Sequence, residues 1–133
     1  MTVLVDTSAM YAALDADDEN HMRARDAFGD LAPREHLLTH SYVLVESSAL
    51  VQRRLGFEAV RALFDDLVAA MDVVWVDEAL HRSALAAMIA SGSAAVSLVD
   101  WTSFEIMRRR GIDRAFAFDD DFTTHGFELV SSS

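Results

Sequence analysis

Short apolar runs alternate with longer amphipathic stretches along this chain of 133 residues. Runs of four or five apolar residues are typical of buried strands, whereas apolar residues three and four positions apart are typical of helices. The pattern predicts strands at residues 2–5, 36–39, 72–76, 115–118 and 127–130. It predicts helices at residues 7–14, 20–32, 41–55, 57–71, 78–91 and 97–110.

Small and polar residues mark the ends of several predicted helices. Ser41 and Ser97 stand where helices begin and can cap them, and Gly56 and Gly111 stand where helices end. Helices that alternate with short apolar strands indicate an α/β fold, with a mainly parallel sheet of four or five strands and helices on both faces. The length fits one domain covering residues 1–133.

The large apolar side chains are expected in the core, among them Phe64, Trp75, Phe104 and the methionines. The Ser131–Ser133 tail is expected to fray. No apolar run approaches the roughly 18 residues of a membrane span, and the first residues lack the basic segment of a signal peptide. We therefore expect a cytoplasmic protein with no membrane partner.

Composition excludes several classes of function. A net charge of -11 argues against broad nonspecific binding of nucleic acid. The absence of cysteine removes thiolate catalysis and zinc–thiolate sites, and all 11 basic residues are arginine, which removes catalytic lysine. A cluster of arginines at 108–110 and 114 either complements the dipole of a helix end or contacts phosphates, and both can hold.

Acidic residues stand at the edges of four apolar segments, and they are Asp6, Glu46, Asp100 and the run Asp119–Asp120–Asp121. Parallel α/β sheets bind ligands at the carboxyl ends of their strands, and Asp6 and Asp119 directly follow predicted strands. Carboxylates gathered there repel one another unless a cation or protons neutralise them. Oxygen ligands favour a hard cation such as Mg²⁺ or Mn²⁺.

Each acid also has a local explanation. Asp6 can cap the following helix, and Ser97-x-x-Asp100 has the spacing of a capping box. Three consecutive aspartates suit a turn. Glu46 is harder to explain without a cation, because Val43 and Leu50 place it on or beside the apolar face of its helix.

The other candidate residues carry less weight. The five histidines show no zinc-binding spacing, and we expect surface or capping positions for all of them. Trp101 is expected in the core, with an aromatic face for base stacking as the alternative. Ser8 offers a hydroxyl that can orient the Asp6 carboxylate or a water beside it.

Four fragments in this order resemble the PIN-domain ribonucleases, and within them the VapC-type toxins of bacterial toxin–antitoxin pairs. They are VDTSA, VESSALVQRRLG, SLVDWTSFEIMRRRGI and FAFDDDF, and the resemblance spans essentially the whole chain. Two positions depart from the family's pattern. Ala117 replaces a hydroxyl residue that many relatives carry, and Trp101 replaces a smaller residue.

The resemblance implies an endoribonuclease that uses Mg²⁺ or Mn²⁺ and cleaves transfer RNA or a ribosomal RNA loop. The matching metal ligands are Asp6, Glu46, Asp100 and Asp119, with Asp121 as a further acid and Ser8 in support. It also implies a homodimer and inhibition by a cognate antitoxin. We expect Arg108 and Arg109 to hold phosphates of the RNA. The alternative is a noncatalytic binding protein, whose acidic site is structural or vestigial.

Overall fold

The computed structural model describes residues 1–130, so the expectation for the Ser131–Ser133 tail lies outside the described residues. The strands are β1 (Thr2–Val5), β2 (His36–His40), β3 (Asp72–Val74), β4 (Arg114–Phe116) and β5 (Glu128–Leu129). The main helices are α1 (Thr7–Leu14), α2 (His21–Leu31), α3 (Ser41–Leu55), α4 (Phe57–Ala62), α5 (Glu78–Ser91), α6 (Leu98–Arg110) and α7 (Asp121–Thr124). The predicted α/β class is confirmed.

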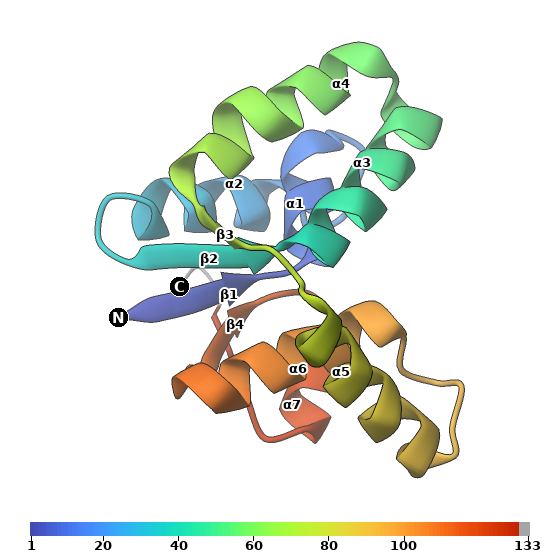
Figure 1. Cartoon of the computed structure of the whole chain (residues 1–133). Helices are drawn as coiled ribbons and strands as arrows, with labels where there is room; N and C mark the ends of the chain where they lie inside the picture. Colours follow the sequence, from blue (N-terminus) through green and yellow to red (C-terminus); the bar gives the residue numbers. More distant parts are fainter. Residues whose placement is uncertain (131–133) are drawn as a thin grey trace.

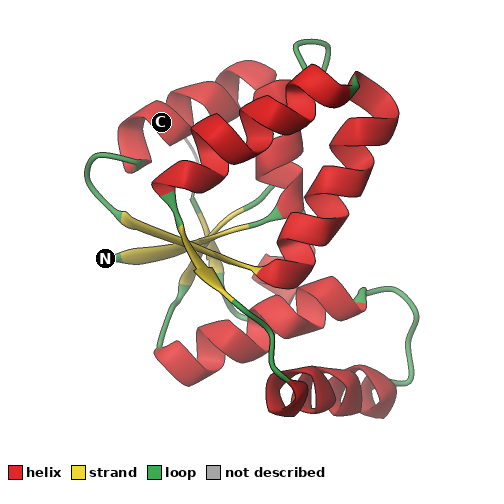
Figure 2. Ribbon diagram, turned by 45° about the horizontal axis from the view of Figure 1, so that its top comes forward, coloured by secondary structure: helices red, strands yellow, loops and turns green. Residues whose placement is uncertain are grey.

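All five strands form one parallel sheet in the order β3-β2-β1-β4-β5 (Figure 1). Helices α1 to α4 lie on one face, and α5, α6 and α7 lie on the other (Figure 2). Each face has its own core, one around Phe28 and Phe116 and the other around Phe104 and Phe122. The prediction of helices on both faces is therefore confirmed.

The helical connections change from one face of the sheet to the other at β1 and β4, which are neighbours in the sheet. The connections that leave β1 and β2 cross the first face, whereas those that leave β3 and β4 cross the second. Because β1 and β4 are neighbours in the sheet, their carboxyl ends diverge into helices on opposite faces. This divergence opens a crevice at the carboxyl edge, which is where doubly wound sheets bind ligands.

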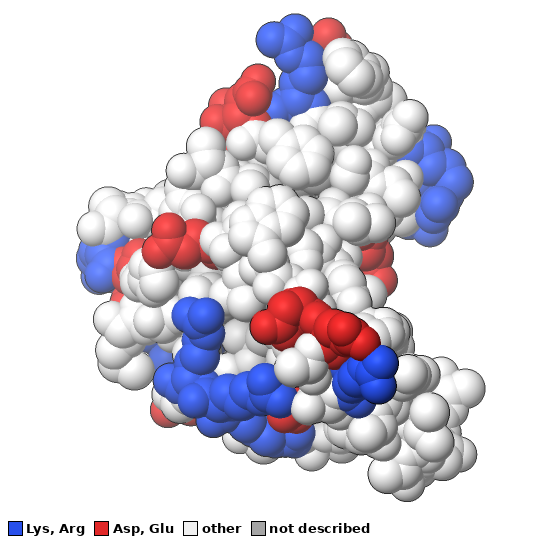
Figure 3. Space-filling model, viewed as in Figure 1, with Lys and Arg blue, Asp and Glu red and all other residues white. Residues whose placement is uncertain are grey.

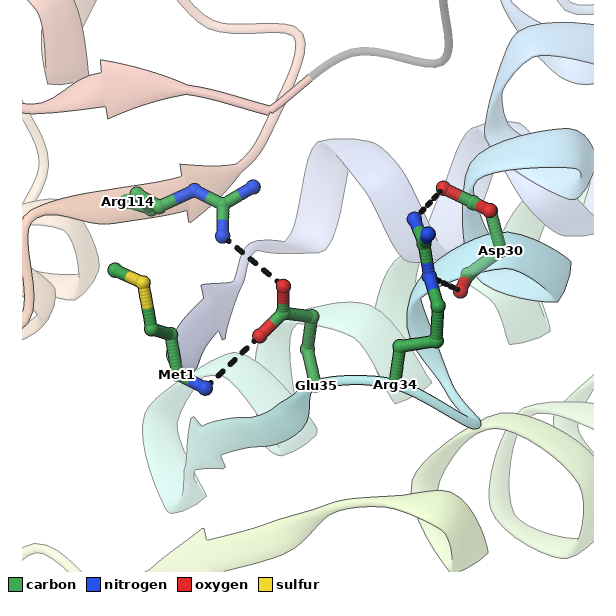
Figure 4. A network of polar contacts seen from close by, with 5 residues as sticks. All are labelled: Met1, Asp30, Arg34, Glu35 and Arg114. Carbon is green, nitrogen blue, oxygen red and sulfur yellow. Dashed lines mark hydrogen bonds and ion pairs between the residues drawn. The ribbon is translucent and has the colours of Figure 1, made fainter.

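A polar network closes the opposite, amino edge of the sheet (Figure 4). The Glu35 carboxylate accepts from the amino group of Met1 at 3.0 Å and from Arg114 Nη1 at 3.3 Å. Arg34 pairs separately with Asp30, one helical turn away. Arg114 is thus engaged at the edge away from Asp6, and it does not extend the arginine cluster toward the acids.

The predicted helix over 57–71 is present over residues 57–70, but its second half is not α-helical. It continues from α4 as a π-helical segment, Leu63–Leu67, and a short 3-10 turn, Val68–Ala70. Val60, Leu67 and Val68 pack against the core of this face of the sheet, as their spacing predicted. Leu63 remains buried, but Phe64 turns outward and is 37% exposed.

Trp75 and two methionines also correct the predicted core. β3 ends at Val74 on the open edge of the sheet, so no neighbouring strand covers Trp75, which is 72% exposed. Met1 and Met22 are exposed as well, whereas Phe104 is fully buried as predicted. Trp75 and Phe64 line an apolar groove of about 460 Å³ with Val45 and Leu44 of α3. The face seen in Figure 3 is uncharged over a broad area where α3 and the chain entering β3 come forward.

A buried and an exposed phenylalanine should lose different amounts of stability when each is replaced by alanine. We expect Phe104→Ala to lower the free energy of unfolding by about 3–5 kcal/mol, because the ring is fully buried among Phe122, Phe127 and Trp101. Phe57→Ala is the matched control, since that ring is 70% exposed and its loss should change stability by less than about 1 kcal/mol. Urea unfolding measures both, and equal losses would contradict the assigned core.

Candidate metal and active site

Three carboxylates converge in the crevice between the two helical layers. Single oxygens of Asp6, Asp100 and Asp119 all lie within 4.8 Å of one another. They come from the end of β1, the first turn of α6 and the segment after β4. Ligands about 2.1 Å from one Mg²⁺ ion lie roughly 3–4 Å apart, so small side-chain rotations would bring the three oxygens onto a single ion.

The two oxygens of Asp6 have different surroundings. Oδ2 accepts from the Ser8 hydroxyl at 2.7 Å and from the Ser8 amide at 3.2 Å, which caps α1 as the sequence suggested. Oδ1 is buried and has no hydrogen-bond partner among the described residues. A buried unpaired carboxylate oxygen is costly, and a cation beside it would satisfy it. The residues present therefore fit a divalent cation.

Ser8 also connects Asp6 to the segment that carries Asp119. Its hydroxyl accepts from the amide of Phe118 at 2.9 Å while it donates to Asp6. One side chain thus fixes the orientation of Asp6 and the position of the chain just before Asp119. The supporting position proposed for Ser8 from the sequence agrees with these contacts.

Asp100 combines a helix-start position with a place in the acidic group. Ser97 Oγ caps α6 by accepting from the Asp100 amide at 3.2 Å, as predicted. The Asp100 carboxylate makes no return bond to Ser97 among the described hydrogen bonds, and it lies with Asp6 and Asp119 instead. Half of the expected capping box is therefore present.

Glu46 and Asp121 border the group of three. Glu46 lies half-buried on α3, and its charge raises the pKa of both Asp6 and Asp100. The Asp121 amide donates to Asp119 Oδ1 at 2.9 Å, and partial burial together with Asp119 raises the pKa of the Asp121 carboxyl. Neither residue belongs to the closest set of oxygens, but both add negative charge to the same crevice.

Burial and mutual repulsion make these acids hard to ionise. Burial, and then the neighbouring carboxylates, raise the pKa of Asp100 to about 8. Burial raises the pKa of Asp6 to about 6 against the opposing effect of its Ser8 hydrogen bonds. Without a cation, protons thus replace part of the missing positive charge.

Two other predicted residues lie away from this group. Arg108 and Arg109 are in the last turn of α6, which begins next to the acids, so at about 1.5 Å per residue they lie roughly 12 Å along the helix from Asp100. Arg108 lies over the Phe127 ring, and Arg109 contacts Glu105 and Ser83. Trp101 is buried against Phe104 and His125, which agrees with a core position.

Sequence reasoning missed a set of buried polar contacts behind the acids. Thr39 Oγ1 donates to the carbonyl of Val5, and His40 bonds Ser103 on α6. The cap of α3 is His40 and not Ser41. A capping role was one of the two positions expected for the histidines, but His40 is fully buried and does not lie on the surface. The available signal was a polar pair, Thr102 and Ser103, between the aromatic residues Trp101 and Phe104.

Comparison with known proteins assigns this architecture. The PIN domain family matches residues 3–128. The chain belongs to the PIN domain family. The resemblance drawn from the four sequence fragments is therefore confirmed.

Individual relatives with the PIN domain cover nearly the whole chain. The 23S rRNA-specific endonuclease VapC20 of Mycobacterium tuberculosis is 35% identical over 129 residues, which is 96% of this chain and 97% of that protein. The crystal structure of this VapC20, a sarcin–ricin loop cleaving toxin, aligns over 98% of this chain and 99% of its own with a TM-score of 0.88 and 33% identity. VapBC2 from Rickettsia felis, solved with a promoter DNA fragment, shares the fold with a TM-score of 0.72, 12% identity and coverage of 99% and 100%.

The raised pKa values predict how the metal-free PIN domain responds to pH. A carboxyl whose pKa is higher in the folded state binds protons more tightly there, so the free energy of unfolding falls as pH rises from about 4 to about 8. We expect Asp100→Asn to remove most of the decline between pH 6 and 8. Chemical denaturation in chelator measures this, with Asp65→Asn, on an exposed position, as the control. Stability that rises over this interval would contradict the assignment.

Proposed function

We propose that this PIN domain is a toxin-type endoribonuclease that uses Mg²⁺ or Mn²⁺ to hydrolyse a ribosomal RNA phosphodiester bond. The observation that carries the proposal is the Asp6 carboxylate: one of its oxygens lies within 4.8 Å of oxygens of Asp100 and Asp119, and its buried Oδ1 has no hydrogen-bond partner among the described residues. The identity to a 23S rRNA-specific endonuclease supports the substrate class, including the sarcin–ricin loop as the first target to test. Such a substrate puts the site of action in the cytoplasm.

In the proposed mechanism the protein supplies oxygen ligands and their orientation. Asp6, Asp100 and Asp119 would hold the cation, and Glu46 and Asp121 would add negative charge beside it. When bound, a Mg²⁺ or Mn²⁺ ion would activate water and offset negative charge on the leaving oxygen. Ser8 engages Oδ2 of Asp6 through two hydrogen bonds, which orients the carboxylate and leaves Oδ1 as the oxygen available to a ligand. Arg108 and Arg109 hold phosphates of the same RNA at a distance from the bond that is cut.

A cleavage assay tests the proposed activity. We expect the purified protein to cut ribosomal RNA into discrete fragments with Mg²⁺ or Mn²⁺ and not with chelator. Asp6→Asn should lower the rate about a hundredfold or more, because it removes a charged ligand from the cation. Asp65→Asn changes a surface acid and should cut like the wild type. Metal-dependent binding of RNA with no cleavage would favour the noncatalytic alternative.

We further propose that two copies associate through the apolar groove. Val45, Phe64 and Trp75 are exposed on this surface, which therefore offers projecting side chains and a cavity on one patch. A two-fold interface requires such self-complementarity, because the same patch meets its own copy. The cognate antitoxin then remains free to cover the acidic crevice, and the VapBC assemblies that share the fold support an antitoxin partner.

Sedimentation measures the proposed dimer. We expect the wild type to have twice the chain mass of 14.7 kDa, and Trp75→Arg to sediment as a monomer because it puts an unpaired charge into an apolar interface. Ala90→Arg, on an exposed position of α5 outside the groove, should remain dimeric. A dimer that survives Trp75→Arg would place the interface elsewhere.

For the chain that the structure describes, no helix is both long and apolar enough to cross a bilayer.

A further inference from the structure

The helices that carry Glu46 and Asp100 lie on opposite faces of the sheet. Glu46 is in the second turn of α3, and Asp100 is in the first turn of α6. The sheet separates the two cores into which these helices pack. The distance between Glu46 and Asp100 across the acidic crevice therefore depends on the contacts that join α3 to α6 beyond the end of the sheet.

His40 makes that connection. It is the last residue of β2, its ring is fully buried, and both ring nitrogens have partners. Nδ1 accepts from the Val43 amide at 3.4 Å, which caps α3. Nε2 lies 2.8 Å from the hydroxyl of Ser103, three residues after Asp100 on α6.

The partners determine which nitrogen carries the proton. The Val43 amide is a donor, so Nδ1 must be an unprotonated acceptor and the proton must be on Nε2. Nε2 then donates to Ser103 Oγ, and the Ser103 hydroxyl donates to the carbonyl of Val99 at 3.2 Å. The chain of donors ends on the residue that precedes Asp100, and every group in it is satisfied.

Thr39, the residue before His40, connects the end of β2 to the segment that carries Asp6. Thr39 Oγ1 donates at 3.0 Å to the carbonyl of Val5, the residue before Asp6. Two consecutive side chains at the end of β2 thus hold the backbone beside Asp6 and the helix that carries Asp100. The helix that carries Glu46 begins at the next residue.

We infer that His40, acting through Ser103, is a positioning residue that sets the separation of Asp100 from Asp6 and Glu46 for cation binding. The inference rests on the proposed metal-dependent function. The reason is geometric, because α6 contacts α3 from across the sheet and this bond is a buried side-chain link between the residue that caps α3 and the second turn of α6. Loss of the bond lets α6 shift relative to α3, and the carboxylates then hold a cation less well.

Chain positions 102 and 103 provide a matched pair of variants. Thr102 and Ser103 are both fully buried on α6, and each hydroxyl donates to the carbonyl four residues earlier. Of the two, only the Ser103 hydroxyl is bonded to His40 among the described residues. Ser103→Ala therefore removes the link to α3, whereas Thr102→Val removes a hydroxyl and keeps the link.

Calorimetric titration of the chelator-treated protein with Mn²⁺ tests the inference. We expect Ser103→Ala to raise the Mn²⁺ dissociation constant about tenfold or more, and Thr102→Val to leave it within about twofold of the wild type. His40→Asn should weaken binding like Ser103→Ala, because asparagine still caps α3 but is too short to reach Ser103. His40→Asn serves as the second variant if Ser103→Ala does not fold. In RNA cleavage at limiting Mn²⁺, kcat should fall while KM for the RNA stays unchanged.

The Mn²⁺ titrations can contradict the inference in three ways. Equal Mn²⁺ affinity for Ser103→Ala and the wild type would overturn the inference, as would equal weakening by Thr102→Val, which would indicate a general effect of α6 packing. A wild-type protein that binds no Mn²⁺ would overturn the proposed function itself. The tautomer gives a readout that needs neither metal nor RNA: ¹⁵N NMR should find the His40 proton on Nε2. A proton on Nδ1 would contradict the bond from the Val43 amide, and with it the link that His40 makes between α3 and Ser103.

Discussion

Repulsion among carboxylates in one crevice is the constraint on which the rest of this structure depends. Asp6 and Asp100 are buried, Asp119 lies beside them, and Glu46 and Asp121 add charge from the rim. Such an arrangement opposes folding unless protons or a cation neutralise it. The remainder of the chain must therefore supply enough stability to hold these groups together, and two apolar cores on the faces of the sheet do so.

The topology explains why the acids meet although they come from distant parts of the chain. β1 and β4 are neighbours at the centre of the sheet, and the segments that follow them diverge to opposite faces. Asp6 and Asp119 follow these two strands, while α6 starts in the same crevice and brings Asp100. Short side-chain links then refine the arrangement, with Ser8 between β1 and the chain after β4, and His40 between α3 and α6.

The two sides of α3 differ in chemical character, since one carries an acid and the other an exposed apolar surface. One side faces the crevice with Glu46, while Val45 on the neighbouring position is exposed beside Trp75. Exposed apolar groups of this size are a liability in an isolated monomer, and an interface removes them from water. The π-helical segment that turns Phe64 outward contributes to the same surface.

The sequence by itself determined the class of fold, most element boundaries and three acidic residues, Asp6, Asp100 and Asp119, that the fold brings together. These features depend on local patterns: apolar runs ending at Asp6, capping by Ser97, and glycines at helix ends such as Gly111 with its positive φ of 67°. The periodicity of apolar positions and backbone capping are local features that span a few residues, so the order of residues was enough to predict them.

Only the tertiary structure decided which acids come closest and what supports them. The bond from His40 to Ser103 joins residues 63 positions apart, and no local pattern encodes such a contact. The outward position of Trp75 likewise depends on an open sheet edge, which apolar character alone does not reveal. Long-range packing sets these distances, because the free energy of a buried polar group depends on partners that the fold brings from elsewhere in the chain.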